Sequence, residues 1–194
     1  MGPSLRVDEP RVVMVDDEKK VADAYALRLQ DAAEVTVAYN GRDALAAITE
    51  GRPPDVVLLD RHMPGLSGDD VLDRIREQAI RTQVIMVTAI DPNLGVLDMP
   101  FDDYLSKPVD REDLFAAIDQ QCEVLAYDLL GEYFRLESTR AVVAAELSPV
   151  ELDGSDRLAE IETELETTET RIRELLPDAD DLLAEFDGID RDGY

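Results

Sequence analysis

Residues 56–68 read VVLLDRHMPGLSG, a run of four apolar residues that ends in Asp60 and continues into a Pro-Gly loop. The run has the length and the β-branched content of a buried strand. A carboxylate at the end of such a strand is unfavourable unless it is paired or used. Asp60 could also simply cap the loop, as aspartates often do in turns. The residues that follow the other strands decide between these two interpretations.

Short apolar runs alternate with helix-like segments from residue 11 to about residue 122. This alternation predicts an α/β fold in which a parallel sheet is covered by helices on both faces. The segment between Thr88 and Lys107 contains Pro92, Gly95 and Pro100, which predict a short or irregular helix there. The expected strands are 11–15, 34–38, 55–59, 82–87 and 102–105, and the expected helices follow Asp17, Asn40, Ser67 and Asp110.

Chemically active side chains follow four of the expected strands, where ligands gather in such sheets. Each residue alone has an ordinary explanation, such as a helix cap, a β-forming threonine or a loop lysine. Together, however, three carboxylates repel one another unless a cation is present, and oxygen ligands suit Mg²⁺. A hydroxyl and an ammonium would complete a site for phosphoryl transfer onto a carboxylate. The candidate residues are Asp16, Asp17, Asp60, Thr88 and Lys107.

Four motifs resemble the receiver domain of two-component response regulators over residues 10–122: VDDE (15–18), LLDRHMPGLSG (58–68), TA (88–89) and DYLSKP (103–108). The resemblance implies a flavodoxin-like, doubly wound, five-stranded parallel sheet. It also implies that Asp60 accepts a phosphoryl group from a sensor histidine kinase. By the same resemblance, the chain is not expected to be an enzyme, and its only reactions would be the phosphorylation and dephosphorylation of its own Asp60.

The same resemblance assigns a role to each site residue. Asp16, Asp17 and Asp60 would hold Mg²⁺ together with the backbone carbonyl of His62, whose imidazole would have no chemical role. Lys107 would pair with the phosphoryl group, and its bond to Pro108 is expected to be cis. Thr88 and Tyr104 would act as the switch, Thr88 by moving toward the phosphoryl group and Tyr104 by turning inward. Tyr104 could instead be a simple core aromatic.

The helical part of the chain begins near residue 123 and shows no strand signal. One helix is expected to continue toward Glu146, although Gly131 weakens it. Loop signals at 148–155 precede a second helix, whose apolar residues are spaced alternately by three and four, and a last short helix follows Pro177. The expected architecture is a helical, coiled-coil-like hairpin, closed on itself or paired with a second chain. The spaced residues are Leu158, Ile161, Leu165, Thr168, Ile172 and Leu175.

This helical part resembles the HalX domain that follows haloarchaeal receivers. The expected domains are a leader (1–9), the receiver (10–122), a HalX-like output domain (123–190) and a tail (191–194). The resemblance implies transcriptional regulation, yet residues 123–194 carry 21 acidic and 6 basic residues, a net charge of −15. Phosphate contacts need clustered Lys or Arg, so a phosphorylation-controlled protein–protein adaptor that does not bind DNA stays an alternative.

Composition points to a salt-rich habitat. The 194 residues carry a formal net charge of −26, yet 45% of them are apolar, which disordered acidic chains are not. Dense carboxylate surfaces of this kind resemble those of haloarchaeal proteins, in which salt screens the self-repulsion. A single cysteine, Cys122, and the absence of long apolar runs favour a cytoplasmic protein. A phosphatase of the haloacid dehalogenase type is disfavoured, because His62 stands where such enzymes place their acid.

Overall fold

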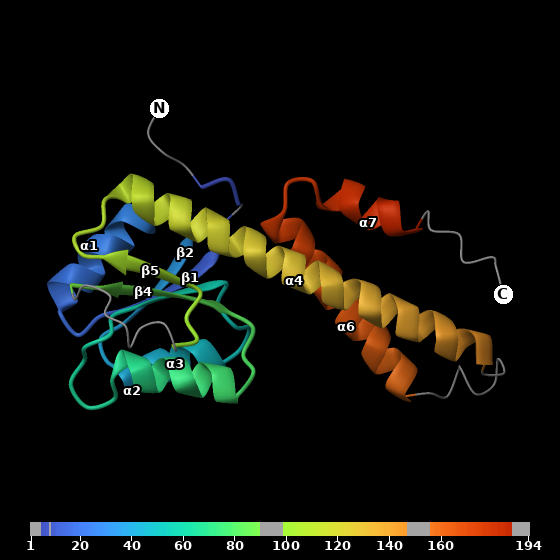
Figure 1. The fold of residues 1–194 in the computed structure, drawn as a ribbon, viewed down its shortest axis with the longest axis horizontal. Coiled ribbons are helices and arrows are strands. Elements are labelled where there is room, and N and C mark those ends of the chain that lie inside the picture. Colours follow the sequence, from blue (N-terminus) through green and yellow to red (C-terminus); the bar gives the residue numbers. More distant parts are fainter. Residues whose placement is uncertain (1–4, 8, 90–98, 147–155, 188–194) are drawn as a thin grey trace. The chain divides into compact units, whose positions relative to one another are not determined.

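The computed structural model describes residues 5–7, 9–89, 99–146 and 156–187 (Figure 1). The chain forms two compact units, Met1–Leu125 and Ala126–Tyr194, and the boundary between them lies within the long helix α4. Among the described residues, no helix combines the length and the apolar character that a membrane span requires.

The first unit is built on a five-stranded parallel sheet with the strand order β2-β1-β3-β4-β5. This order and the alternation of strands with helices confirm the doubly wound, flavodoxin-like fold. Each strand both starts and ends within one residue of its expected bounds. They are β1 (Arg11–Val15), β2 (Glu34–Ala38), β3 (Val56–Leu59), β4 (Gln83–Thr88) and β5 (Asp103–Ser106), and the helices are α1 (Lys19–Leu29), α2 (Gly41–Thr49), α3 (Gly68–Glu77) and α4 (Arg111–Glu146).

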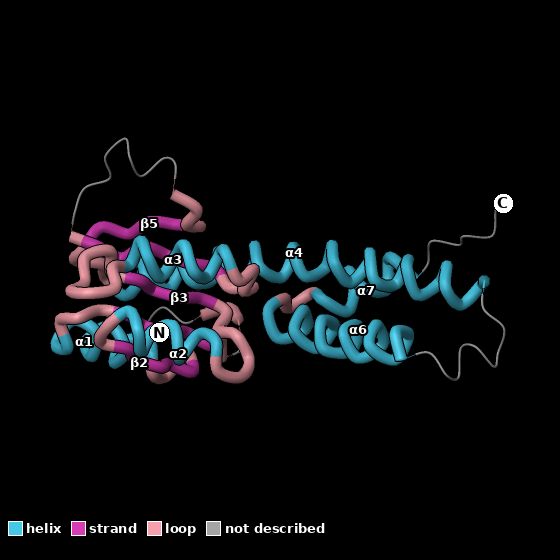
Figure 2. The backbone as a smooth tube through the Cα atoms, turned by 90° about the horizontal axis from the view of Figure 1, so that it is seen from below, coloured by secondary structure: helices cyan, strands magenta, loops and turns pink. Residues whose placement is uncertain are grey.

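Burial explains why the central strands are continuous apolar runs. Every residue of β3 and β4 is buried, whereas the edge strands β2 and β5 are partly exposed. Helices α2 and α3 cover one face of the sheet, and α1 and the first part of α4 cover the other (Figures 1 and 2). Side chains alternate along a strand, so Val13 and Val15 of β1 belong to the core beneath α2 and α3.

Two helices that follow strands have well-formed N-terminal caps. The side chain of Asn40 accepts hydrogen bonds from the backbone N–H groups of Arg42 and Asp43 at the start of α2. Ser67 and Asp70 form a reciprocal capping box at the start of α3. The helix begins directly after Ser67, as expected from the sequence. Such caps typically contribute about 1 kcal/mol each and fix where the loop from Asp60 ends.

The second unit is helical. Helix α4 continues to Glu146 without a break at Gly131, and α6 (Asp156–Leu175) and α7 (Ala179–Asp187) follow. The heptad residues Ile161 and Leu165 of α6 are buried against Leu136 of α4, with Tyr133 beside them. The hairpin therefore closes within one chain, which was one of the two arrangements that the sequence left open.

Some expectations fall outside the described residues. The irregular helix expected between Thr88 and Lys107 includes residues 90–98, and the loop at 148–155 and the tail at 191–194 are likewise not described. The domain boundaries at residues 10, 122 and 190 stay predictions.

Candidate functional site

The carboxyl edge of the sheet brings two aspartates together through the backbone ladders. The Asp60 N–H donates to the Val15 carbonyl (2.9 Å), and the Asp16 N–H donates to the Ala38 carbonyl (3.1 Å). Each aspartate thus continues its strand pairing by one residue. Because β1 and β3 are neighbours in register, Asp16 and Asp60 leave the sheet side by side.

Three carboxylates form a cluster at this edge. One carboxylate oxygen from each of Asp16, Asp17 and Asp60 lies within 4.8 Å of the other two. Asp16 is fully buried and Asp60 is 6% exposed, whereas Asp17 is partly exposed. Such a set of hard oxygen donors suits a small divalent cation, which can retain several waters on its open side.

Lys107 links the two buried aspartates. Its Nζ donates to Asp16 Oδ2 at 2.6 Å and to Asp60 Oδ1 at 2.9 Å. The Lys107–Pro108 peptide bond is cis, as the sequence resemblance implied, and the Lys107 backbone N–H donates to the Thr88 carbonyl (2.9 Å). The lysine is therefore held by strand pairing, and its ammonium group lies within the acidic cluster.

The electrostatics of the site favour a further cation. Burial raises the pKa of the Asp60 carboxyl, Lys107 offsets part of that rise, and the charge of Asp16 adds to it. Burial alone would lower the pKa of Lys107, but its hydrogen bonds to Asp16 and Asp60 outweigh burial and raise it. Lys107 thus stays charged, and one ammonium faces three carboxylates. A bound divalent cation would compensate the remaining negative charge.

The loop after Asp60 depends on two glycines. Gly65 has φ +82°, a left-handed conformation that favours glycine. At Gly68, the first residue of α3, an added Cβ would lie 2.2 Å from the Asp60 carbonyl oxygen. The N-terminus of α3 can therefore approach the backbone of Asp60 only if this residue is glycine. This packing role of Gly68 cannot be read from the sequence, because nothing in the local pattern reveals an approach through space.

The His62 side chain is exposed, whereas its backbone hydrogen bond to the Asp60 carboxylate lowers the pKa of that group. The structure thus places the backbone of His62 at the site. Arg61, the residue before it, forms an ion pair with Asp69 of α3 (3.1 Å) that ties the loop to the helix.

The two expected switch residues lie on adjacent strands. Thr88 is buried at the end of β4 and is paired in register with Ser106, the residue before Lys107. Tyr104 lies in β5 opposite Met86 and is partly buried, and its ring centroid is 5.9 Å from that of Phe101. Both residues therefore lie on the strands that lead into the site.

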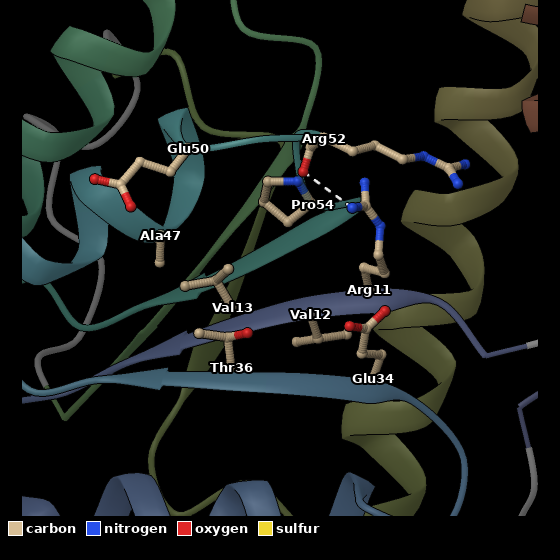
Figure 3. A pocket seen from close by; sticks show the side chains of 9 residues that line it. All are labelled: Arg11, Val12, Val13, Glu34, Thr36, Ala47, Glu50, Arg52 and Pro54. Carbon is tan, nitrogen blue, oxygen red and sulfur yellow. Dashed lines mark hydrogen bonds between the residues drawn. The ribbon is translucent and has the colours of Figure 1, made fainter. Parts of the chain in front are cut away.

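The opposite, amino end of the sheet carries a separate pocket of about 200 Å³ (Figure 3). Arg11 and Glu34 begin their strands there, and the Arg11 guanidinium donates to the Arg52 carbonyl (3.0 Å) across the wall of the pocket. None of the predicted site residues lines it. The acidic cluster and this pocket are thus distinct features at opposite ends of the strands.

Strand order, acidic cluster and lysine together define the class of receiver-like α/β proteins. Residues 12–119 match the response regulator receiver domain, and residues 123–187 match the HalX domain. The chain belongs to the response regulator receiver family of two-component systems, with a HalX domain after the receiver. Receiver domains are regulators that are phosphorylated by histidine kinases.

Relatives support the same assignment. A Haloferax volcanii protein whose name describes a transcriptional regulator is 36% identical over 167 residues, 85% of this chain and 28% of that protein. The transcriptional regulatory protein TcrA of Mycobacterium tuberculosis is 37% identical over 58% of this chain and 46% of its own length. The solved receiver domain of Francisella response regulator 1452 has a TM-score of 0.54 and 32% identity, covering 58% of this chain and 96% of that structure.

The chain thus spans less than a third of the Haloferax protein and about half of TcrA. Of these three matches, the Haloferax protein aligns with 85% of this chain, whereas the other two align with 58% of it, a portion the size of the receiver domain.

Proposed function

We propose that the chain accepts a phosphoryl group on Asp60 from a sensor histidine kinase and thereby switches its helical HalX unit in the control of transcription. The single observation that carries this proposal is the convergence of three carboxylates and the Lys107 ammonium at one edge of the sheet. Asp60 is the aspartate of this cluster that leaves the central strand β3 and enters the glycine-dependent loop.

The proposed reaction is a group transfer to Asp60. A carboxylate oxygen of Asp60 forms a bond to phosphorus as the bond between phosphorus and the kinase imidazole breaks. The imidazole leaves with the electron pair of that bond and takes up a proton. Lys107, already 2.9 Å from Asp60, would pair with a phosphoryl oxygen and keep its contact with Asp16. Hydrolysis of the aspartyl phosphate at the same site would reset the regulator.

Mg²⁺ fits the donor set of the acidic cluster. Asp16, Asp17 and Asp60 would each supply one oxygen, and the backbone carbonyl of His62 would supply another. When bound, the metal would neutralise the charge on the transferring phosphoryl oxygens. The chain itself contributes the placement of the acids, and the buried Asp16 accepts a hydrogen bond that holds Lys107 beside them.

The switch would pass from Thr88 to Tyr104. In the phosphorylated state the Thr88 hydroxyl would donate a hydrogen bond to a phosphoryl oxygen, which draws the end of β4 toward Asp60. The adjacent strand β5 pairs with β4 along its whole length, so a shift of β4 is transmitted to Tyr104. Tyr104 would then turn toward the space that Thr88 leaves.

Labelling with a small-molecule phosphodonor in molar KCl and Mg²⁺ tests the phosphoacceptor. We expect Asp60→Asn to abolish the label, which should be cleaved by hydroxylamine as an acyl phosphate. Asp73→Asn is the matched control, because Asp73 is an exposed carboxylate of α3 and its replacement makes the same change in charge. Full labelling of Asp60→Asn would contradict the assignment of Asp60.

The output is tested by genome-wide DNA occupancy in a salt-rich host, comparing the native chain with Asp60→Asn. Discrete peaks that are lost in the variant would support control of transcription by phosphorylation. The net charge of −15 in residues 123–194 favours the alternative of a phosphorylation-controlled adaptor that acts through protein partners. The absence of peaks in both strains, with partners recovered by cross-linking, would establish that alternative.

A further inference from the structure

Helix α1 holds both backbone groups of Val109, a residue of the segment that joins β5 to α4. The Val109 N–H donates to the Tyr25 hydroxyl (3.1 Å), and the Arg28 guanidinium donates to the Val109 carbonyl. Tyr25 and Val109 are buried, whereas Arg28 is half-buried. The Arg28 guanidinium also lies over the Tyr25 ring, with Cζ 5.1 Å from the ring centroid. Tyr25, Arg28 and Val109 therefore form one connected set, the Val109 clamp.

The Val109 clamp lies two residues after Lys107, where strand pairing ends. The Lys107 N–H donates to the Thr88 carbonyl, and the next residue, Pro108, has no N–H with which to continue the ladder. Strand β5 is also an edge strand, with β4 as its only neighbour among the described strands, and α4 begins only at Arg111. The clamp thus supplies a second attachment, to α1, for the backbone beside Lys107.

We propose that Tyr25 and Arg28 are positioning residues for Lys107. They hold the backbone of the lysine so that its ammonium group contacts Asp16 and, after transfer, a phosphoryl oxygen on Asp60. This positioning role rests on the proposed phosphoacceptor role, and it adds two residues of α1 that are not members of the acidic cluster. Neither of the two forms or breaks a bond in the transfer.

Positioning matters at this site because one nitrogen has two partners. The Nζ of Lys107 lies 2.6 Å from an Asp16 oxygen and 2.9 Å from an Asp60 oxygen. Both aspartates are held by backbone hydrogen bonds to neighbouring strands, so they would not follow a displaced lysine. Misplacing a catalytic group by roughly 1 Å can slow a reaction by about a hundredfold. Loss of the Val109 clamp would therefore weaken the contacts of the ammonium group and slow the transfer.

Stability alone does not distinguish this role from a purely structural one. Tyr25→Phe keeps the ring and its packing but leaves the buried Val109 N–H without its acceptor, which destabilises the folded chain in either case. A purely structural clamp, however, would not change the surroundings of the Lys107 ammonium in chains that remain folded. The decisive measurement therefore follows the lysine itself.

Lysine side-chain NMR tests the positioning role without phosphorylation. The chain has only three lysines, so ¹⁵N labelling of lysine gives three ammonium signals, and Lys19→Arg and Lys20→Arg assign that of Lys107 by elimination. The Lys107 ammonium donates two hydrogen bonds and its side chain is 14% exposed, which should slow the exchange of its protons with water. We expect Tyr25→Phe to shift this signal and to speed the exchange by about threefold or more, the weight of one weakened hydrogen bond. Tyr127→Phe, which loses the hydroxyl of an exposed tyrosine, is the matched control and should leave the signal unchanged.

Labelling of Asp60 by acetyl phosphate gives the functional readout. At saturating Mg²⁺ in molar KCl, we expect Tyr25→Phe and Arg28→Ala to be labelled about tenfold more slowly than the native chain. Their affinity for Mg²⁺, measured by calorimetry, should stay native, because all three carboxylates of the cluster are retained. Arg28→Lys should restore most of the rate, since its ammonium group can donate to the same carbonyl.

The two readouts separate failure of the positioning role from failure of the phosphoacceptor role. A Lys107 signal in Tyr25→Phe that matches the native chain would overturn the positioning role, whether or not Asp60 is labelled. A shifted signal with a native labelling rate would overturn it as well, because the lysine would have moved without consequence. A shifted signal in a chain whose native form takes no label would support the hold of the clamp on Lys107 and refute the phosphoacceptor role.

Discussion

Gly68→Ala tests how closely α3 must approach the phosphoacceptor loop. An added Cβ would lie 2.2 Å from the Asp60 carbonyl oxygen and 2.9 Å from the Arg61 Cα, both backbone atoms. Overpacking of this kind costs about 1–3 kcal/mol. The opposing gain from replacing glycine in a helix is at most about 1 kcal/mol, and is smaller at the first helical position. We therefore expect a net loss of about 1–2 kcal/mol in the free energy of unfolding.

The assay is urea unfolding at constant KCl and at a chain concentration low enough to exclude self-association. Gly131→Ala is the matched control, because the same substitution meets open space there and should stabilise the chain by up to about 1 kcal/mol. Labelling of Gly68→Ala by a phosphodonor should also slow, since α3 or the backbone of Asp60 must move. If Gly68→Ala were as stable as the native chain and were labelled at the native rate, the close approach would not be a constraint.

Three further predictions concern the site and its supports. Burial, as the largest cause, raises the pKa of Asp60 in the folded chain, so protonated Asp60 favours folding and this contribution to the free energy of unfolding is lost as the pH rises through the raised pKa. Asp60→Asn should therefore flatten the acidic part of a pH series of urea unfolding. In chelator at neutral pH, this variant should be more stable than the native chain. Mg²⁺ at a hundredfold excess over its dissociation constant should stabilise the native chain by about 2.7 kcal/mol, and Asp17→Asn should lose most of this gain. Arg76→Ala removes hydrogen bonds to the carbonyls of Thr82 (3.0 Å) and Pro100 (2.8 Å) and should cost about 1–3 kcal/mol in urea unfolding, with the exposed Arg74→Ala as control.

The sequence predicted the fold and the placement of the acidic cluster because one rule connects them. Parallel strands that alternate with helices all present their carboxyl ends at one edge, so residues that follow separate strands must converge there. Asp16, Asp60 and Lys107 do so, although 91 residues separate the first from the last. Their roles in phosphoryl transfer stay predictions, because geometry alone does not report a reaction.

Other features were beyond a reading of the sequence. Ile118, Cys122 and Leu125 predict one apolar face of α4, and these residues are indeed buried. The heptad of α6 could not choose between an internal and an external partner, since both satisfy the same spacing. Only the packing of Leu136 against α6 shows which side of α4 is occupied.

Lysine is rare in this chain, with three among 19 basic residues, and one of the three lies in the acidic cluster. Arginine would keep the positive charge there, so the retention of Lys107 calls for a geometric reason. A single nitrogen of Lys107 contacts both Asp16 and Asp60, and the side chain is only 14% exposed. A planar guanidinium is bulkier and presents its donors as a fixed fork, which does not converge on one point between two carboxylates.

Lys107→Arg and Lys107→Met separate charge from shape. Lys107→Met removes the charge at similar length, and we expect it to fold in chelator only at lower pH, where Asp60, whose pKa is raised by burial, can take up a proton. For Lys107→Arg we expect a loss of about 1–3 kcal/mol from overpacking in urea unfolding. Labelling of Asp60 should be slow in both variants, because the arginine cannot pair with Asp16 and a phosphoryl oxygen from one nitrogen. Native labelling of Lys107→Arg beside an inactive Lys107→Met would mean that positive charge alone suffices, and the geometric reason for lysine would be wrong.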